Sequence, residues 1–117
     1  MVRKRINSFR FAFRGIATLL RTQPNARIHV AAAVAVIVLG VVIGLGTVEW
    51  CLVIIAISMV IATEALNSAL EFLADHTAPE WHEAVERIKD LSAGAVLLAS
   101  AGALAVGLLV FLPHILK

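Results

Sequence analysis

The sequence predicts an all-α membrane protein, with an N-terminal amphipathic surface helix followed by three transmembrane helices. Three observations support this fold class. The 117 residues are 61% hydrophobic, and the mean hydropathy of +0.94 exceeds what a single soluble domain of this length can bury. Three apolar runs each reach the roughly 20 residues that a bilayer crossing requires. Finally, seven of the ten Lys and Arg residues precede the first of these runs.

Residues 6–22 carry apolar side chains at helical spacing, with arginines at other positions of the helix. This pattern is typical of an amphipathic helix lying in the membrane interface, where its cations suit anionic lipid headgroups. We therefore expect no nucleic acid partner. Pro24 ends this helix because it disfavours helical geometry at Gln23. The apolar positions are Ile6, Phe9, Phe13, Ile16, Ala17 and Leu20, and the arginines are Arg10, Arg14 and Arg21.

The three spans are expected at residues 28–48, 50–74 and 88–112, within one domain of residues 1–117. The first has His29 as its only strongly polar residue, and the short link before Trp50 forces an antiparallel return. A polar connection, residues 76–86, precedes the third span, which ends at Pro113. Nine basic residues lie on the side of the N-terminus and residues 76–90, against only Lys117 at the other end. The positive-inside rule therefore predicts a cytoplasmic N-terminus and an extracytoplasmic C-terminus.

Small residues recur every four positions in two spans, which allows helices to approach closely in lipid. This pattern fits packing within one chain as well as an oligomer interface. Three spans alone could hardly enclose a polar cavity, however, so the polar residues described next favour an oligomer. The small residues are Gly40 and Gly44 in the first span, and Ala95, Ala99, Ala103 and Gly107 in the third.

Four polar residues form a stripe on the second span: Glu64, Asn67, Glu71 and Asp75. Their spacing brings all four onto one helical face, at about 100° per residue. Ionisable groups at membrane depth are costly unless they are paired or hydrated, so this face must meet something other than lipid tails. We interpret the polar stripe as a candidate active site. The alternative is a buried polar cluster that only holds helices together.

Depth along the stripe suggests a different role for each residue. Glu64 lies deepest, where a carboxylate suits a general base for a weakly acidic hydroxyl. Glu71 is two turns nearer the cytoplasm and suits Mg²⁺, which needs one or two carboxylates plus phosphate oxygens and water. Asn67 lies between them and can orient either group.

Lys89 and Asp90 open the third span at the level of Asp75. A lysine there can meet phosphate oxygens, and Asp90 can accept a hydrogen bond from a neighbouring group or water. The alternative is interfacial anchoring with compensation of the helix dipole. Any nucleotide must bind without a Walker or kinase glycine loop, because neither motif is present. The four histidines lack zinc-ligand spacing, which favours structural or interfacial roles for His29, His76, His82 and His114.

The motif Glu64-Ala-Leu-Asn67-Ser-Ala-Leu-Glu71-x-x-x-Asp75, followed by Lys89-Asp90-x-x-Ala93, resembles the signature of the prokaryotic diacylglycerol kinase family, which includes undecaprenol kinases. The resemblance covers nearly the whole chain. It implies a homotrimeric three-span lipid kinase with active sites between subunits at the cytoplasmic interface. Such an enzyme would transfer the γ-phosphoryl of MgATP to a membrane lipid hydroxyl.

The resemblance also implies roles for individual residues. Glu64 matches the catalytic base that meets the lipid hydroxyl, Asn67 the motif asparagine, and Glu71 a carboxylate that holds the metal. At Gln23 the sequence departs from well-known members, which carry a second metal-binding glutamate there; an amide oxygen can ligate Mg²⁺ but brings no charge. The positions that match residues around the nucleotide are Asp75, Glu80, His82, Lys89 and Asp90.

Substrate choice is divided between two signatures. The segments Phe9–Gly15 and Asn25–His29 resemble the undecaprenol kinase type, whereas Glu80-Trp81-His82-Glu83 resembles the loop of proteobacterial diacylglycerol kinases. We favour a polyprenol slightly over diacylglycerol. Two hypotheses from other classes stay open: a proton or ion pathway along the polar stripe, and a membrane scaffold. The ion-pathway hypothesis assigns no role to Lys89 and Asp90. The scaffold hypothesis predicts that substitutions in the stripe do not affect function as long as the protein folds.

Overall fold

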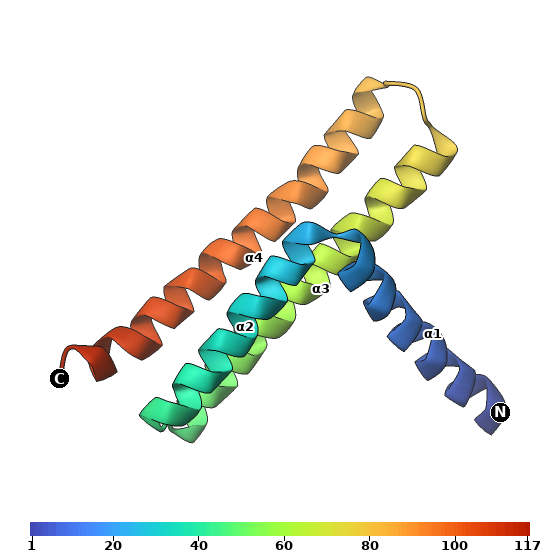
Figure 1. Cartoon of the computed structure of the whole chain (residues 1–117). Coiled ribbons are helices and arrows are strands. Elements are labelled where there is room, and N and C mark those ends of the chain that lie inside the picture. Colours follow the sequence, from blue (N-terminus) through green and yellow to red (C-terminus); the bar gives the residue numbers. More distant parts are fainter.

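The computed structural model describes all residues, 1–117, and its regular structure is entirely helical. Three of the four helices are long and apolar enough to cross a membrane, which confirms the predicted fold class. The first helix leaves the other three at a large angle (Figure 1). The helices are α1 (Val2–Thr22), α2 (Pro24–Ile43), α3 (Thr47–Thr77) and α4 (Glu83–Ile115).

The corner between α1 and α2 follows from one proline. Gln23 is extended, with φ −115° and ψ 106°, as expected for a residue before proline. Pro24 then occupies the first turn of α2, where its missing N–H and fixed φ are tolerated. The first membrane helix therefore starts four residues earlier than the expected 28. Because α1 and α2 cannot continue as one rod, α1 turns away from the bundle at the start of α2 (Figure 1).

Gly44 ends α2 before the predicted residue 48. Its φ of +83° is a left-handed conformation that favours glycine, and its N–H bonds to the carbonyl of Gly40 at 2.9 Å. Gly40 itself packs against α3, since a Cβ there would lie 2.8 Å from the Trp50 ring. Both glycines of the first small-residue pair therefore serve turns and contacts within the chain.

The helices α3 and α4 are longer than the sequence suggested. At 1.5 Å per residue, the 31 residues of α3 extend about 46 Å, well beyond a hydrocarbon core of about 30 Å. The connection between them is therefore shorter than predicted, with residues 78–82 in place of 76–86. Pro113 does not end α4, because it lies in the last turn, where only one helical hydrogen bond is lost. The joined ends of α3 and α4 project past the corner between α1 and α2 (Figure 1).

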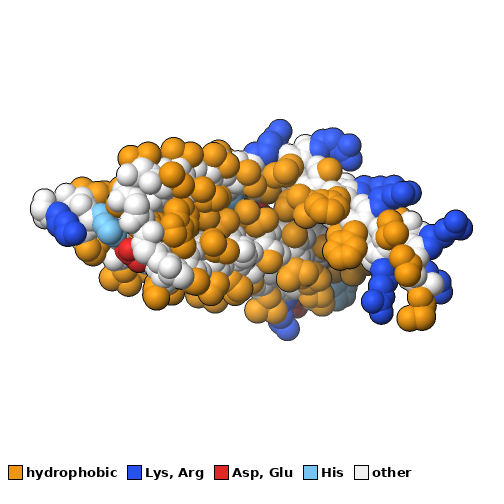
Figure 2. Space-filling model, turned by 90° about the horizontal axis from the view of Figure 1, so that it is seen from below, with side chains coloured by type: hydrophobic (Ala, Val, Ile, Leu, Met, Phe, Trp, Pro, Cys, Tyr) orange, Lys and Arg blue, Asp and Glu red, His pale blue; other side chains and the backbone are white.

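Packing within the chain is sparse. Most contacts join α3 to α4, and fewer join α2 to α3. Only 13 of the 117 residues are buried, and the buried core of Leu45, Val53, Val110 and Phe111 lies near the end opposite α1. Figure 2 shows a hydrophobic surface along most of the molecule, with Lys and Arg gathered at the end that carries α1. Such an apolar surface requires lipid or other subunits to cover it.

A histidine–glutamate pair joins the far ends of α3 and α4. His114 Nε2 lies 2.8 Å from Glu49 Oε2, and the other oxygen of Glu49 accepts from the Gly46 N–H at 3.1 Å. Glu49 thus closes the start of α3 and holds the end of α4 against it. This geometry agrees with the structural role expected for His114.

Candidate active site

The polar stripe of α3 changes from buried to exposed along its length. Glu64 is buried, Asn67 and Glu71 are half-buried, and Asp75 is exposed. This order follows the tapering of the bundle, since α2 flanks α3 only as far as the corner at Gln23 (Figure 1). The stripe therefore runs from a shielded site between helices to an open site near the end of α3.

Glu64 meets a partner that the sequence interpretation missed. His29 Nε2, from the second turn of α2, lies 3.2 Å from Glu64 Oε1. The Glu64 side chain is only 6% exposed, whereas that of His29 is 29% exposed. A carboxylate this shielded requires a compensating group, and His29 is the only ionisable residue at ion-pair distance. The sequence indicated this contact only weakly. His29 is the single histidine of the first span, and an antiparallel hairpin places it near the level of Glu64.

Asn67 is held from α4 by Ser92, which sequence reasoning also missed. Ser92 Oγ donates to Asn67 Oδ1 at 2.6 Å, and the same hydroxyl lies 3.0 Å from the carbonyl of Lys89. Ser92 is buried, so water does not compete for this contact. With its oxygen held, the Asn67 amide can direct its N–H groups at an acceptor such as a phosphate oxygen.

Removing the Ser92 hydroxyl should free the Asn67 amide to rotate. We expect Ser92→Ala to lower kcat about two- to tenfold, which corresponds to the net 0.5–1.5 kcal/mol of one hydrogen bond. Steady-state assays in mixed micelles measure this effect. Ser100→Ala is the matched control, because Ser100 is on the same helix and its Oγ is buried without a hydrogen-bond partner. Equal losses in both variants would contradict the role of Ser92.

The open end of the stripe carries a lysine between carboxylates. Lys89 Nζ lies 2.7 Å from Asp75 Oδ1, and Glu71 is close enough to add to the electrostatic stabilisation of the ammonium. The Asp75 and Lys89 side chains are 66% and 37% exposed, so this pair contributes little to stability. It is instead a polar site open to a soluble ligand. Asp90, next to Lys89, is exposed and has no partner within the chain.

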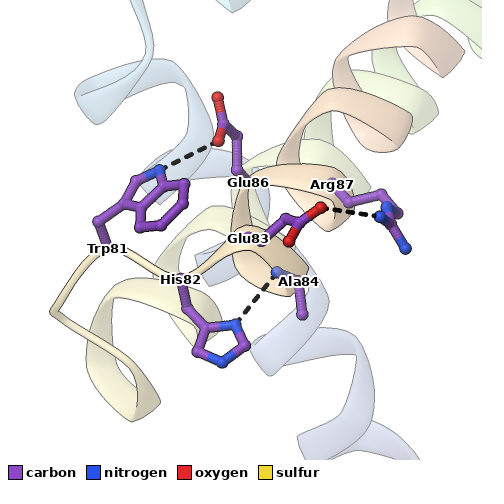
Figure 3. A network of polar contacts seen from close by, with 6 residues as sticks. All are labelled: Trp81, His82, Glu83, Ala84, Glu86 and Arg87. Carbon is purple, nitrogen blue, oxygen red and sulfur yellow. Dashed lines mark hydrogen bonds and ion pairs between the residues drawn. The ribbon is translucent and has the colours of Figure 1, made fainter.

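The connection residues make their side-chain contacts around the start of α4. His82 accepts the Ala84 N–H through Nδ1 at 3.1 Å, which caps α4. Trp81 Nε1 donates to Glu86 Oε2 at 3.0 Å, and Arg87 pairs with Glu83 at 3.4 Å (Figure 3). Glu80 is exposed and makes no side-chain contact with the stripe. The structure thus joins Glu64, Asn67, Asp75 and Lys89 to partners across helices, but leaves Glu80 and His82 apart from them.

The chain has oxygen atoms that could bind a metal ion, but they do not form a complete coordination sphere. Glu71 forms no hydrogen bond and no ion pair within 4.0 Å, and no group of three or more His, Cys, Asp and Glu residues converges on one point. Gln23, half-buried at the corner before α2, has a side chain without a hydrogen-bond partner. Free carboxylate and amide oxygens fit Mg²⁺, which takes much of its coordination from water and phosphate.

Comparisons with known proteins identify the family of this chain. Residues 10–111 match the family described as prokaryotic diacylglycerol kinase. The chain is 36% identical to the undecaprenol kinase of Bacillus subtilis over 108 residues, covering 92% of this chain and 88% of that protein. It is 38% identical to a diacylglycerol kinase of Synechocystis over 94% of this chain, although it spans only 63% of that longer protein. A diacylglycerol kinase of Haemophilus influenzae is 31% identical over 80% of each chain. The chain therefore belongs to the prokaryotic diacylglycerol kinase family of membrane lipid kinases.

Proposed function

We propose that this protein transfers the γ-phosphoryl of MgATP to a membrane lipid hydroxyl, with undecaprenol favoured over diacylglycerol, and that the polar stripe of α3 is its active site. One observation carries this proposal: a single helical face joins a shielded carboxylate, Glu64, to an exposed lysine–carboxylate pair, Lys89 and Asp75. A lipid kinase needs both environments within one site, because its acceptor is in the bilayer and its donor is in water.

At the lipid end, Glu64 acts as the general base. It takes the proton as the lipid O–H bond breaks, the lipid oxygen bonds to the γ-phosphorus, and the bond from that phosphorus to the bridging oxygen breaks to release ADP. Burial of Glu64 excludes water, which would otherwise compete as the acceptor. Because Glu64 is shielded from water, the hydroxyl that it deprotonates must belong to a lipid in the membrane.

At the water end, Lys89 exchanges its contact with Asp75 for the phosphate oxygens of ATP. Asn67, oriented by Ser92, supplies amide hydrogens between the two ends. Asp75 and Asp90 accept hydrogen bonds around the nucleotide, while Glu80 and His82 reach its base and sugar from the connection. Apart from Asn67, these groups lie at the exposed end of the stripe or beyond it.

Glu71 would hold Mg²⁺, with Gln23 as a neutral second donor at the corner of α1 and α2. When bound, the ion neutralises charge on the transferring phosphoryl group. Glu71 suits this role because its carboxylate forms no hydrogen bond or close ion pair in the chain and lies two turns from the base.

The site is completed by a second copy of the chain, and we propose a homotrimer. Asn67, Glu71 and Asp75 all keep exposed surface within one chain, so the stripe has one uncovered side. The concentration of basic residues on α1 supports a cytoplasmic location for the N-terminus and for the α3–α4 connection, with the C-terminus extracytoplasmic.

The choice of lipid rests on the similarity to the Bacillus subtilis undecaprenol kinase and on the segments Phe9–Gly15 and Asn25–His29. It is tested with purified protein, radiolabelled ATP, and undecaprenol and diacylglycerol supplied side by side. We expect a higher kcat/KM for undecaprenol. A preference for diacylglycerol would reassign the substrate while leaving the kinase intact, and nucleotide-independent ion flux without lipid phosphorylation would contradict the kinase itself.

A further inference from the structure

We propose that His29 is the proton outlet of the active site: it receives from Glu64 the proton that the lipid hydroxyl gives up, and returns it to water. This inference rests on the proposed role of Glu64 as the general base. It adds a second residue, from another helix, to the proton path.

Glu64 needs such an outlet because it is shielded. Each turnover leaves one proton on its carboxyl group, and this proton must leave before the next lipid reacts. Only 6% of the side chain is exposed, so direct exchange with water is restricted. Glu71, the next ionisable residue of the stripe, is seven residues away, which is about 10 Å along the helix.

His29 is placed to accept that proton. Its Nε2 lies 3.2 Å from Glu64 Oε1, within reach of a direct transfer. Its side chain is 29% exposed within the chain, compared with 6% for Glu64, so the ring is the less shielded member of the pair. Imidazole has two ring nitrogens, one that can accept a proton and one that can donate, which suits a relay. Its position on the second turn of α2 is close to the interfacial corner at Gln23.

The transfer balances in two steps. First, the O–H bond of protonated Glu64 breaks and an N–H bond forms at His29 Nε2, which leaves an imidazolium beside a carboxylate. Second, the His29 side chain turns away from Glu64 and the imidazolium releases the Nε2 proton to water, which restores the neutral ring with its proton on Nδ1 for the next turnover. Nothing is oxidised or reduced, and no further reactant is needed. The first step runs along the contact between His29 Nε2 and Glu64 Oε1.

A cavity beside His29 allows the proposed proton transfer to be tested by chemical rescue. It has a volume of about 290 Å³, lies between α2, α3 and α4, and is lined by His29 and by apolar residues including Ala33, Ile57 and Val60. Truncating His29 to alanine extends this cavity toward Glu64. Free imidazole, added to the medium, can then occupy the vacated position and carry the proton.

We expect His29→Ala to lower kcat about ten- to a hundredfold, with the KM for ATP little changed, and added imidazole to restore a substantial part of the loss. His29→Gln keeps a polar side chain of similar length but cannot take a proton, so it should be equally slow. The matched control is His114→Ala, which breaks the other histidine–glutamate pair at the far end of the bundle and should leave kcat unchanged. Imidazole should have no effect on the wild type or on Glu64→Gln.

Three results would overturn the proposal: a wild-type rate for His29→Ala, a wild-type rate for His29→Gln, or a loss in His29→Ala that imidazole does not relieve. The last would assign His29 to packing. These results are distinct from a failure of the proposed function, in which the wild type itself phosphorylates neither lipid.

Discussion

Glu64→Gln is expected to lower kcat for lipid phosphorylation by about 10²- to 10⁴-fold, the range of a lost general base. The amide is isosteric with the carboxylate, but it cannot accept the proton of the lipid hydroxyl. The KM for ATP should change little, because the nucleotide groups lie at the other end of the stripe, around Lys89. Initial rates in mixed micelles at saturating MgATP measure the effect, with thermal stability recorded in the same detergent.

Glu49→Gln is the matched control for this experiment. Glu49 lies on the same helix and is also paired with a histidine, His114, but at the opposite end of the bundle. Its loss should lower thermal stability and leave kcat near the wild-type value. If Glu64→Gln turned over like the wild type, another group would have to take the proton, and the assignment of Glu64 as the base would be lost.

Glu71→Gln should shift the Mg²⁺ requirement to higher concentration, by on the order of tenfold or more. The amide keeps an oxygen donor but removes the charge, which is the main attraction of a carboxylate for Mg²⁺. Gln23 is already neutral, so the chain offers no charged group at the corner of α1 and α2 to compensate. The measurement is the rate as a function of free Mg²⁺ at fixed ATP, with kcat recovering as the ion saturates.

Glu83→Gln provides the comparison for Glu71. Glu83 is also close to the water-exposed end, but it pairs with Arg87 on the surface of α4. Its substitution should leave the Mg²⁺ dependence unchanged. The same unchanged dependence in Glu71→Gln would exclude Glu71 as a ligand.

Local chemistry made much of the fold predictable from the sequence. Helical spacing predicted that Glu64, Asn67, Glu71 and Asp75 share one face, and in the structure their exposure increases from Glu64 to Asp75. Pro24 marked the corner after α1, although we placed the start of the next helix too late, because a proline also fits the first turn of a helix.

Contacts between helices could not be predicted in the same way. Whether His29 meets Glu64, or Ser92 meets Asn67, depends on how each helix is rotated and shifted against its neighbour. A single histidine or serine in an apolar run carries no signal about that register. Gly40 illustrates the same limit, since its spacing fitted an oligomer interface as well as the contact with Trp50 that the structure contains.

Transfer of label from [γ-³²P]ATP to lipid most directly tests the claim that the polar stripe is a lipid kinase site. Wild-type protein and Glu64→Gln are reconstituted in bilayers containing undecaprenol, and the lipid fraction is extracted and counted. We expect labelled lipid phosphate from the wild type and almost none from a folded Glu64→Gln. Label released only as inorganic phosphate, or equal lipid labelling by both proteins, would contradict it.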